Sequence, residues 1–171
     1  MPEPLALPFK ISVLVFVRDE GGKFLLIRRN KAPNLGLWSP IGGKLEMARG
    51  ESPFECAARE TREETGLELS DSDLRMFAMI SEKSYEGGTH WLMFLFDAKK
   101  RIRALPEAIS EGSFGLFGKG EIGGLDIPET DRALLWDAWE KYSQSGFAVM
   151  RADCVSGINA AVEQAETFGT R

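Results

Sequence analysis

A helix whose two ends are both specified by nearby residues is the feature that most restricts how this chain folds. Ser52 suits the N-cap, Pro53 suits the first helical position, and Glu55 lies three residues after Ser52, which completes a capping box. Gly66 provides the left-handed residue with which helices commonly end. The sequence therefore predicts a helix over residues 53–65 from local signals alone.

Three acidic side chains share one face of this predicted helix. Glu60, Glu63 and Glu64 are spaced by three and four residues, so they project from neighbouring turns. They lie in the middle and C-terminal parts of the helix, where the helix dipole does not favour anions. Two interpretations stay open: a solvated acidic face, or a site for a divalent cation such as Mg²⁺ or Mn²⁺, which prefer oxygen ligands.

Most of the excess negative charge of the chain lies around that helix. The 171 residues carry 21 Lys and Arg against 26 Asp and Glu, a net charge of −5, and the segment from Glu46 to Glu68 alone contributes −4. Binding of DNA or RNA without sequence preference needs a basic face, so no nucleic-acid partner is expected. No membrane partner is expected either, because the longest apolar runs, Ile11–Val17 and Trp91–Phe96, fall far short of the roughly 20 residues of a spanning helix.

The length and composition favour one globular domain spanning residues 1–171. Hydrophobic residues make up 43% of the chain, which suffices for a core without a disulfide or a metal. Residues 1–8 have neither a basic start nor a long apolar stretch, so no secretory signal is expected. Cys56 and Cys154 lack the spacing of metal ligands. These features predict a cytoplasmic protein with reduced thiols.

Strands are expected to outnumber helices. Residues 9–17 are β-branched and apolar on both faces, which indicates a strand buried on both sides, and a turn at residues 19–22 makes residues 23–29 its hairpin partner. Strands precede and separate the helices without regular alternation, so the expected fold class is α+β with a mixed sheet. The remaining expected elements are strands over 74–80, 90–97, 113–117 and 147–151, an amphipathic helix over 129–142, and a helix near 158–165.

The predicted helix and its flanking residues resemble a known family motif. From Gly43 to Leu67 the sequence reads GKLEMARGESPFECAARETREETGL. This is similar to the Nudix box, G-x5-E-x7-R-E-U-x-E-E-x-G-U, in which U is a bulky apolar residue. The chain departs from the box in two places: seven residues rather than five separate Gly43 from Glu51, and Thr61 occupies a position that is usually aliphatic. Because the extra residues precede the helix, we expect a longer loop and an intact acidic face.

The resemblance implies a fold, a reaction and a cofactor. Nudix proteins fold as an α/β/α sandwich with a mixed sheet, in which the box forms a loop–helix–loop. The domain core is then expected at about residues 9–145, with residues 146–171 as a C-terminal extension. Family members are hydrolases that cleave a pyrophosphate bond in nucleoside diphosphates linked to another group, using Mg²⁺ or Mn²⁺. The expected partner is a small-molecule nucleotide substrate.

The resemblance also implies a metal site and a catalytic base. Glu60, Glu63 and Glu64 would bind the metal together with the backbone carbonyl of Gly42. In some family members the catalytic base belongs to the box, and in others it is a glutamate on a later loop. Both interpretations stay open here, and Glu111 is the candidate on the later loop.

Other residues of the box would act through structure. By the resemblance, Glu51 would pair with Arg59 and brace the helix rather than touch the metal. Gly43 and Gly66 would shape the loops at the two ends of the helix.

The resemblance points to four substrate-binding candidates. Arg29 or its neighbour Arg28 would contact the phosphates, and Arg29 is preferred because adjacent strand residues face opposite ways. Lys44 would assist. Trp38 is the tryptophan expected nearest the site. Asp131 aligns loosely with a polar residue that recognises the base in family members acting on oxidised guanine, although it also suits a helix N-cap.

Three functions remain compatible with the sequence. The first is Mg²⁺-dependent hydrolysis of (oxidised) (d)NTPs for housecleaning, and the second is hydrolysis of ADP-ribose, a dinucleoside polyphosphate or a related compound. The third is a non-catalytic Nudix-like module that senses a nucleotide, but such modules tend to lose box glutamates and this chain keeps them. A P-loop NTPase is excluded, because Trp38 replaces the first glycine of that motif and Leu45 replaces its Ser or Thr.

Overall fold

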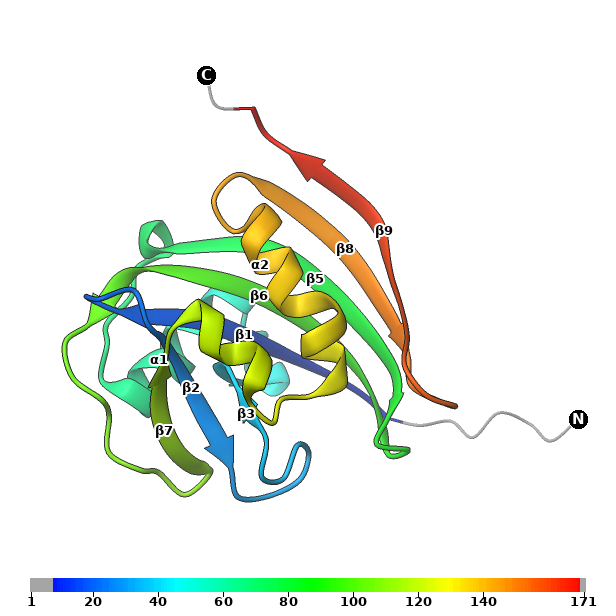
Figure 1. Cartoon of the computed structure of the whole chain (residues 1–171), viewed down its shortest axis with the longest axis horizontal. Coiled ribbons are helices and arrows are strands. Elements are labelled where there is room, and N and C mark those ends of the chain that lie inside the picture. The colour runs from blue at the N-terminus through cyan, green and yellow to red at the C-terminus, as the bar shows by residue number, and fades with distance from the viewer. Residues whose placement is uncertain (1–7, 170–171) are drawn as a thin grey trace, which may run out of the picture.

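Within residues 8–169, which the computed structural model describes, nine strands form one mixed sheet. Residues 1–7, in which no secretory signal is expected, and residues 170–171 lie outside the described part. The strands pair in the order β3-β2-β1-β6-β5-β8-β9, with β4 paired to β1 and β7 to β2 (Figure 1). Their bounds are β1 Phe9–Asp19, β2 Phe24–Arg29, β3 Trp38–Ser39, β4 Ile41–Lys44, β5 Leu74–Tyr85, β6 Thr89–Ile102, β7 Gly112–Phe117, β8 Gly146–Asp153 and β9 Asn159–Thr167.

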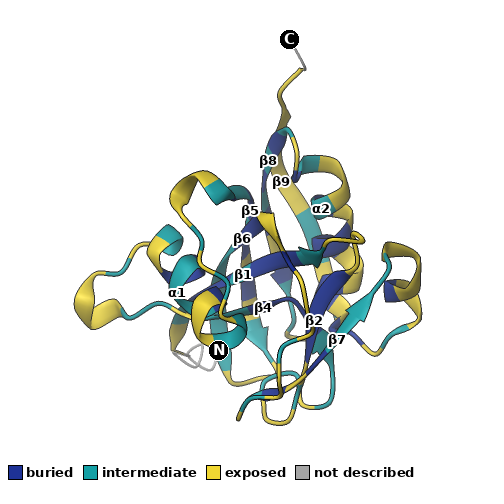
Figure 2. Cartoon of the chain, turned by 90° about the vertical axis from the view of Figure 1, so that its left-hand side faces the viewer, coloured by how far each residue is buried: buried dark blue, intermediate teal, exposed yellow. Residues whose placement is uncertain are grey.

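Helices cover both faces of this sheet. On one face, α1 (Pro53–Thr65) packs over a core that includes Val13 and Val15 of β1. On the other face, the helix that ends in α2 (Trp136–Tyr142) packs over Phe16 and Phe77. Figure 2 shows the two helices on opposite sides of the buried strands. The fold is therefore the α/β/α sandwich with a mixed sheet that the Nudix resemblance implies.

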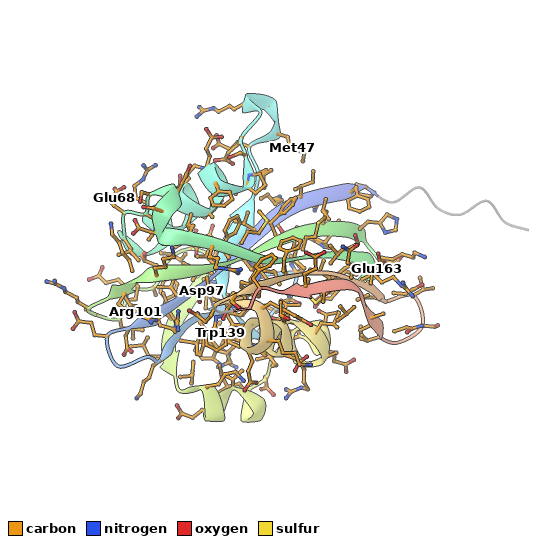
Figure 3. The ribbon with its side chains drawn as sticks, turned by 90° about the horizontal axis from the view of Figure 1, so that it is seen from above. Met47, Glu68, Asp97, Arg101, Trp139 and Glu163 are labelled. Atoms are coloured by element: carbon orange, nitrogen blue, oxygen red, sulfur yellow. The ribbon has the colours of Figure 1, made fainter. Side chains whose placement is uncertain are left out.

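The first helix has the predicted bounds. The side chain of Ser52 accepts a hydrogen bond from the Glu55 backbone N–H (3.2 Å), and the Glu55 carboxylate accepts one from the Ser52 N–H (2.8 Å). Thr61, which departs from the usual pattern, is fully buried, and its hydroxyl donates to the Ala57 carbonyl (2.7 Å), so it is accommodated without an unpaired polar group. The extra residues before the helix form a short 3₁₀ turn at Met47–Arg49 (Figure 3).

The second helix is held against the sheet by a buried polar contact. Residues 131–135 form a π-helical turn that continues into α2. In α2, the Trp139 indole N–H donates to the Asp97 carboxylate on β6 (2.8 Å), which Arg18 also contacts at 2.8 Å (Figure 3). These contacts tie α2 to β1 and β6. Of the helices described, none is long and apolar enough to cross a membrane.

The prediction of a helix near residues 158–165 is wrong, because residues 159–167 form β9. The segment is rich in Ala, Glu and Gln, which favour a helix in isolation. In the folded chain it pairs antiparallel with the free edge of β8, and this tertiary pairing overrides the local preference. β8 itself pairs in parallel with β5 and buries Ala148 and Met150. The sheet thus continues past residue 145, where a C-terminal extension was expected to begin.

Candidate functional site

A cavity of about 590 Å³ runs from α1 and β4 to the β5–β6 pair, a volume that suits one small organic ligand. Between β4 and β5 lie β1 and β6, so three inter-strand steps of about 4.8 Å separate the two ends by roughly 14 Å. The end that we call the acidic end is lined by Gly42, Gly43, Lys44, Glu60, Glu63 and Glu64. The end that we call the distal end is lined by Glu82, Tyr85, Trp91, Met93, Thr130 and Asp131.

Two glycines bring β4 into direct contact with its neighbours at the acidic end. A Cβ atom on Gly43 would lie 2.3 Å from the carboxyl carbon of Glu60. A Cβ atom on Gly42 would lie 2.0 Å from the carbonyl oxygen of Val13 on β1. Because neither position has room for a side chain, the Glu60 carboxylate packs on the β4 backbone. The resemblance gave Gly43 as the first residue of the box and the Gly42 carbonyl as a metal ligand, and these contacts are a steric reason for glycine at both positions.

Arg59 organises the acidic face of α1. Its guanidinium binds both carboxylate oxygens of Glu51, at 2.6 and 3.0 Å, so the expected pair is present. The same guanidinium donates to Glu60 (2.8 Å) and to Glu63 (3.2 Å). The hydrogen bonds from Arg59 lower the pKa of Glu51 to about 2. Glu51 is thus a fixed anion that positions Arg59, and Arg59 in turn positions two of the three glutamates.

Glu64 has no such partner. Its Oε2 atom is buried and accepts no hydrogen bond from the described residues. Burial, followed by the negative charges of Glu60 and Glu111, raises its pKa to about 8. The acidic end therefore contains a carboxylate oxygen that is shielded from water and has no hydrogen-bond partner, and the nearby charge of Arg29 offsets the effect of burial on its pKa only in part.

The side chains of the acidic end do not form a complete cage for a metal ion. In the part of the chain that the structure describes, no group of three or more His, Cys, Asp or Glu side chains is arranged to hold a metal ion by itself. Mg²⁺ is typically bound by one or two carboxylates together with water and substrate phosphates, and seldom by protein groups alone. The donor set of Glu60, Glu63, Glu64 and the Gly42 carbonyl fits an ion that is completed by a bound substrate.

Basic side chains and a further carboxylate flank the acidic end. Arg29 lines the cavity and donates from Nε to the Pro33 carbonyl (2.6 Å), whereas its neighbour Arg28 is exposed and is absent from the lining. Lys44 and Glu111 also line the cavity. Glu111 accepts a hydrogen bond from Ser110 (2.8 Å), and its charge is among those that raise the pKa of Glu64. The chain thus brings Arg29, Lys44 and Glu111 to the same cavity as the box glutamates.

The tryptophan of the cavity is Trp91, not Trp38. Trp38 packs edge-on against Phe117, with ring centroids 4.8 Å apart, and lies outside the cavity lining. Its place beside the box in sequence suggested a site role, but its side chain is used in the core. Trp91 reaches the cavity from β6, where the ammonium group of Lys10 lies 5.5 Å from the centre of its ring.

Comparison with known proteins decides the family. A family model described as NUDIX domain matches residues 8–114, which is more than half of the chain. The chain belongs to the Nudix family. The Nudix hydrolase YvcI of Bacillus subtilis, which is described as uncharacterized, is 36% identical over 114 residues, covering 66% of this chain and 69% of YvcI. The resemblance found in the box is confirmed, and the protein is a hydrolase of the family that cleaves pyrophosphate bonds in nucleotide-linked substrates.

Other relatives share the domain over shorter stretches or share only its fold. NUDT17 of Xenopus laevis, described as an m7GpppN-mRNA hydrolase, is 38% identical over 71 residues, and the match spans 40% of this chain but about a quarter (23%) of NUDT17. The MutT protein of Bacillus halodurans has the same fold, with a TM-score of 0.70, 21% identity and coverage of 90% of this chain and 97% of that one. The NUDIX domain of Shewanella oneidensis NrtR, solved with ADP ribose, gives a TM-score of 0.62 at 18% identity, covering 79% and 87%.

The distal end of this Nudix hydrolase contains one residue that the sequence predicted and one that it missed. Asp131 is 4% exposed, and its side chain makes no helix-capping hydrogen bond, so the N-cap interpretation is wrong. Glu82 is 3% exposed and lines the same end of the cavity. The signal for Glu82 was the alternation along β5, where the buried positions Ala78 and Ile80 lead to Glu82 on the same face.

Proposed function

We propose that this Nudix hydrolase cleaves a phosphoanhydride bond of a nucleoside triphosphate with the help of Mg²⁺ or Mn²⁺. The observation that carries the proposal is the buried, unpartnered carboxylate oxygen of Glu64 at the acidic end of a cavity that continues for about 14 Å toward a distal end. A phosphate chain next to the acidic end would leave the nucleoside part within reach of the distal end.

The residues of the acidic end fit a divalent cation. Glu60, Glu63, Glu64 and the Gly42 carbonyl are the groups that would hold it. When bound, such an ion offsets the charge of the phosphates and lowers the pKa of a coordinated water. Arg29 and Lys44 supply the positive charge that the protein itself brings to the phosphates. Arg59 keeps Glu60 and Glu63 in place through its hydrogen bonds.

Two groups are candidates for the proton of the attacking water. Glu111 lies on the loop before β7, close enough to Glu64 for their charges to interact. A box glutamate is the other candidate, because all three line the cavity. A carboxylate that accepts this proton must reach the water in the substrate complex. Comparing kcat of Glu111→Gln with that of Glu64→Gln tests which carboxylate is needed for this step.

A different substrate class has one observation in its favour. The NUDIX domain of NrtR was solved with ADP ribose, and its fold is similar to this one. ADP-ribose also carries a pyrophosphate bond, so the acidic end would bind its phosphates in the same way as those of a triphosphate. A purely sensory role is less favoured, since Glu60, Glu63 and Glu64 are all present and all line the cavity.

Removal of divalent cations is expected to abolish hydrolysis. We expect wild-type protein treated with EDTA to cleave none of the four canonical dNTPs, 8-oxo-dGTP, ADP-ribose or diadenosine polyphosphates, and added Mg²⁺ or Mn²⁺ to restore the activity. Chromatographic separation of the nucleotide products formed from each substrate, which for ADP-ribose are AMP and ribose 5-phosphate, is the measurement. Hydrolysis that persists in EDTA contradicts the role given to the acidic end, and preference for ADP-ribose over every triphosphate favours the alternative substrate class.

Gly43→Ala is expected to lower kcat/KM by about 10- to 100-fold, because the new methyl group must displace the Glu60 carboxylate. Displacing a group of the active site by about 1 Å can reduce activity by about 100-fold. The best substrate of the panel serves for the assay. Gly120→Ala is the matched control, since a Cβ atom at Gly120 meets open space and its activity is expected to equal that of the wild type. If Gly43→Ala is as active as Gly120→Ala, the proposed role of the Glu60 carboxylate in hydrolysis is contradicted.

A further inference from the structure

Two loops that are far apart in the sequence meet beside the cavity. The loop between β2 and β3, residues 30–37, which we call the strap, reaches the turn between β5 and β6 through Asn34. The Tyr85 hydroxyl donates a hydrogen bond to the side-chain oxygen of Asn34, and the Glu86 carboxylate accepts one from the Asn34 backbone N–H (3.0 Å). β1 and β6 lie between β2 and β5 in the sheet, so the strap joins elements that do not pair (Figure 1).

The strap forms part of the cavity wall along its length. Lys31 and Asn34 both belong to the cavity lining. The Lys31 ammonium lies 3.5 Å from the carboxylate of Glu111, which flanks the acidic end, and Asn34 binds Tyr85, which lines the distal end. The strap therefore runs from the side of the proposed phosphates to the side of the nucleoside, and its position sets the room that a ligand has.

The strap is attached by hydrogen bonds and not by core packing. Its base is fixed on β2, where the Gly36 N–H donates to the Arg29 carbonyl (2.7 Å) and the Arg29 N–H donates to the Leu37 carbonyl (3.1 Å). In the described part of the chain, no residue from 30 to 37 belongs to a hydrophobic core cluster, and Leu35 is 66% exposed. Opening of the strap at Asn34 therefore breaks few hydrogen bonds and exposes no core side chain.

The backbone at this contact is strained. Asn34, Ser84 and Glu86 have φ angles of 64°, 55° and 50°, in the left-handed region that residues with a Cβ atom rarely adopt. Within residues 8–169 they are the non-glycine residues with positive φ, and all three lie in the two segments that meet here. Strain of this kind persists where the surrounding structure holds it and often accompanies a functional site. Since the contact adds nothing to the core, its closed geometry indicates a role at the cavity.

The cavity with the strap in place suits a compact ligand. Its volume of about 590 Å³ fits one small organic molecule, such as a nucleotide with one nucleoside and a phosphate chain. A dinucleoside polyphosphate carries a second base and sugar at the far end of that chain. With the phosphates at the acidic end, this second nucleoside would meet the strap where Lys31 pairs with Glu111.

We propose that the hydrogen bonds of Asn34 with Tyr85 and Glu86 form a latch that makes the enzyme selective for substrates with one nucleoside. Such substrates fit the cavity while the strap is closed, and dinucleoside polyphosphates enter only while it is open. The inference rests on the proposed function for the orientation of the nucleotide. Because only the open fraction of the protein admits the longer ligand, the apparent affinity for that ligand falls in proportion to this fraction.

Matched pairs of ligands isolate the effect of the second nucleoside. Adenosine tetraphosphate and diadenosine tetraphosphate have the same base and the same number of phosphates, as do the two corresponding guanosine compounds. In Mg²⁺, we expect the wild type to favour the single-nucleoside member of the better pair by at least about tenfold in kcat/KM, as for an open state populated a tenth of the time or less. Chromatography of the products gives the rates, and this measurement needs no variant to fold.

Variants of the latch are expected to reduce that preference. Glu86→Ala and Tyr85→Phe each remove one hydrogen bond of the latch, so each is expected to lower the preference by about two- to tenfold. Glu86→Gln keeps an acceptor for the Asn34 N–H and is expected to keep the wild-type preference. Glu20→Ala is the matched control, because it removes an exposed acid from the β1–β2 turn at the opposite edge of the sheet.

Hydrogen exchange follows the strap without any ligand. Peptides that cover residues 31–36 are expected to exchange faster in Glu86→Ala and Tyr85→Phe than in the wild type, because the Asn34 amide loses protection when the latch is weakened. Glu20→Ala is expected to exchange at the wild-type rate. A strap with only a structural role would also exchange faster, but its loosening would affect both members of a ligand pair alike.

The outcomes distinguish the latch from the proposed function. Equal use of both members of each pair by the wild type overturns the latch, and so does an unchanged preference in variants whose strap exchanges faster. If the wild type cleaves triphosphates and gives either result, the proposed function stands and the latch does not. If it cleaves neither triphosphates nor tetraphosphates, calorimetric Kd values of the same pairs replace kcat/KM. A lower preference in the latch variants then supports the latch, although the proposed function fails.

Discussion

Glu64→Gln is expected to lower kcat for nucleotide hydrolysis by about 10²–10³-fold, with a much smaller change in KM. The amide keeps the size of the side chain but removes the negative charge from the one box glutamate that has a buried oxygen without a partner. Glu60 and Glu63 already share Arg59, so they cannot replace the lost charge at that oxygen. Steady-state kinetics at saturating Mg²⁺, with the best substrate of the panel, give both parameters.

Two controls make the loss specific. Glu68→Gln changes an exposed acid just beyond the end of α1 (Figure 3) and is expected to keep wild-type kinetics. The thermal midpoint of Glu64→Gln is expected to equal or exceed that of the wild type without metal, because the substitution removes repulsion between buried acids. A folded Glu64→Gln variant with near-wild-type kcat contradicts the assignment of Glu64 to the cation.

The parts of this protein that local sequence determines were predicted well. The bounds of α1 follow from its cap residues, which act within one turn of each end and do not depend on the rest of the fold. The pairing of Glu51 with Arg59 was available from the family motif, and the structure contains it. The choice of Arg29 over Arg28 used only the alternation of strand side chains, and Arg29 is the one that lines the cavity.

The parts of the protein that depend on long-range strand pairing were not predicted from the sequence. β9 forms because β8 presents a free edge, and composition alone cannot reveal that edge. Trp38 and Trp91 are each plausible at a cavity by residue type, and their roles are decided by which strand borders the core and which borders the cavity. Glu82 could have been found from the alternation in β5, but its neighbour Asp131 lies 49 positions away in the chain and meets it only after folding.

Stability is expected to fall as the pH rises from about 5 to 8, and Glu82→Gln is expected to reduce that fall. Glu82 has a pKa of about 7 in the folded protein against 4.5 for an unperturbed glutamate, because burial disfavours its charged form. Between these two values the folded state holds a proton that the unfolded chain has lost, so the free energy of unfolding decreases with rising pH. The Glu82 contribution to this decrease is at most about 3 kcal/mol.

Urea unfolding at pH 5, 6, 7 and 8 in EDTA measures the effect as a difference between wild type and variant. The raised pKa of Glu64 at the acidic end acts in the same direction in both proteins and cancels in the comparison. Loss of the Glu82 charge also lowers the pKa of Asp131, which reduces the fall further in the variant. Glu51 acts in the opposite direction, but its pKa of about 2 confines its effect to pH values below 4.5. Glu129→Gln is expected to follow the wild-type curve, since that acid is exposed. Parallel pH profiles for wild type and Glu82→Gln would contradict the raised pKa of Glu82 in the folded protein.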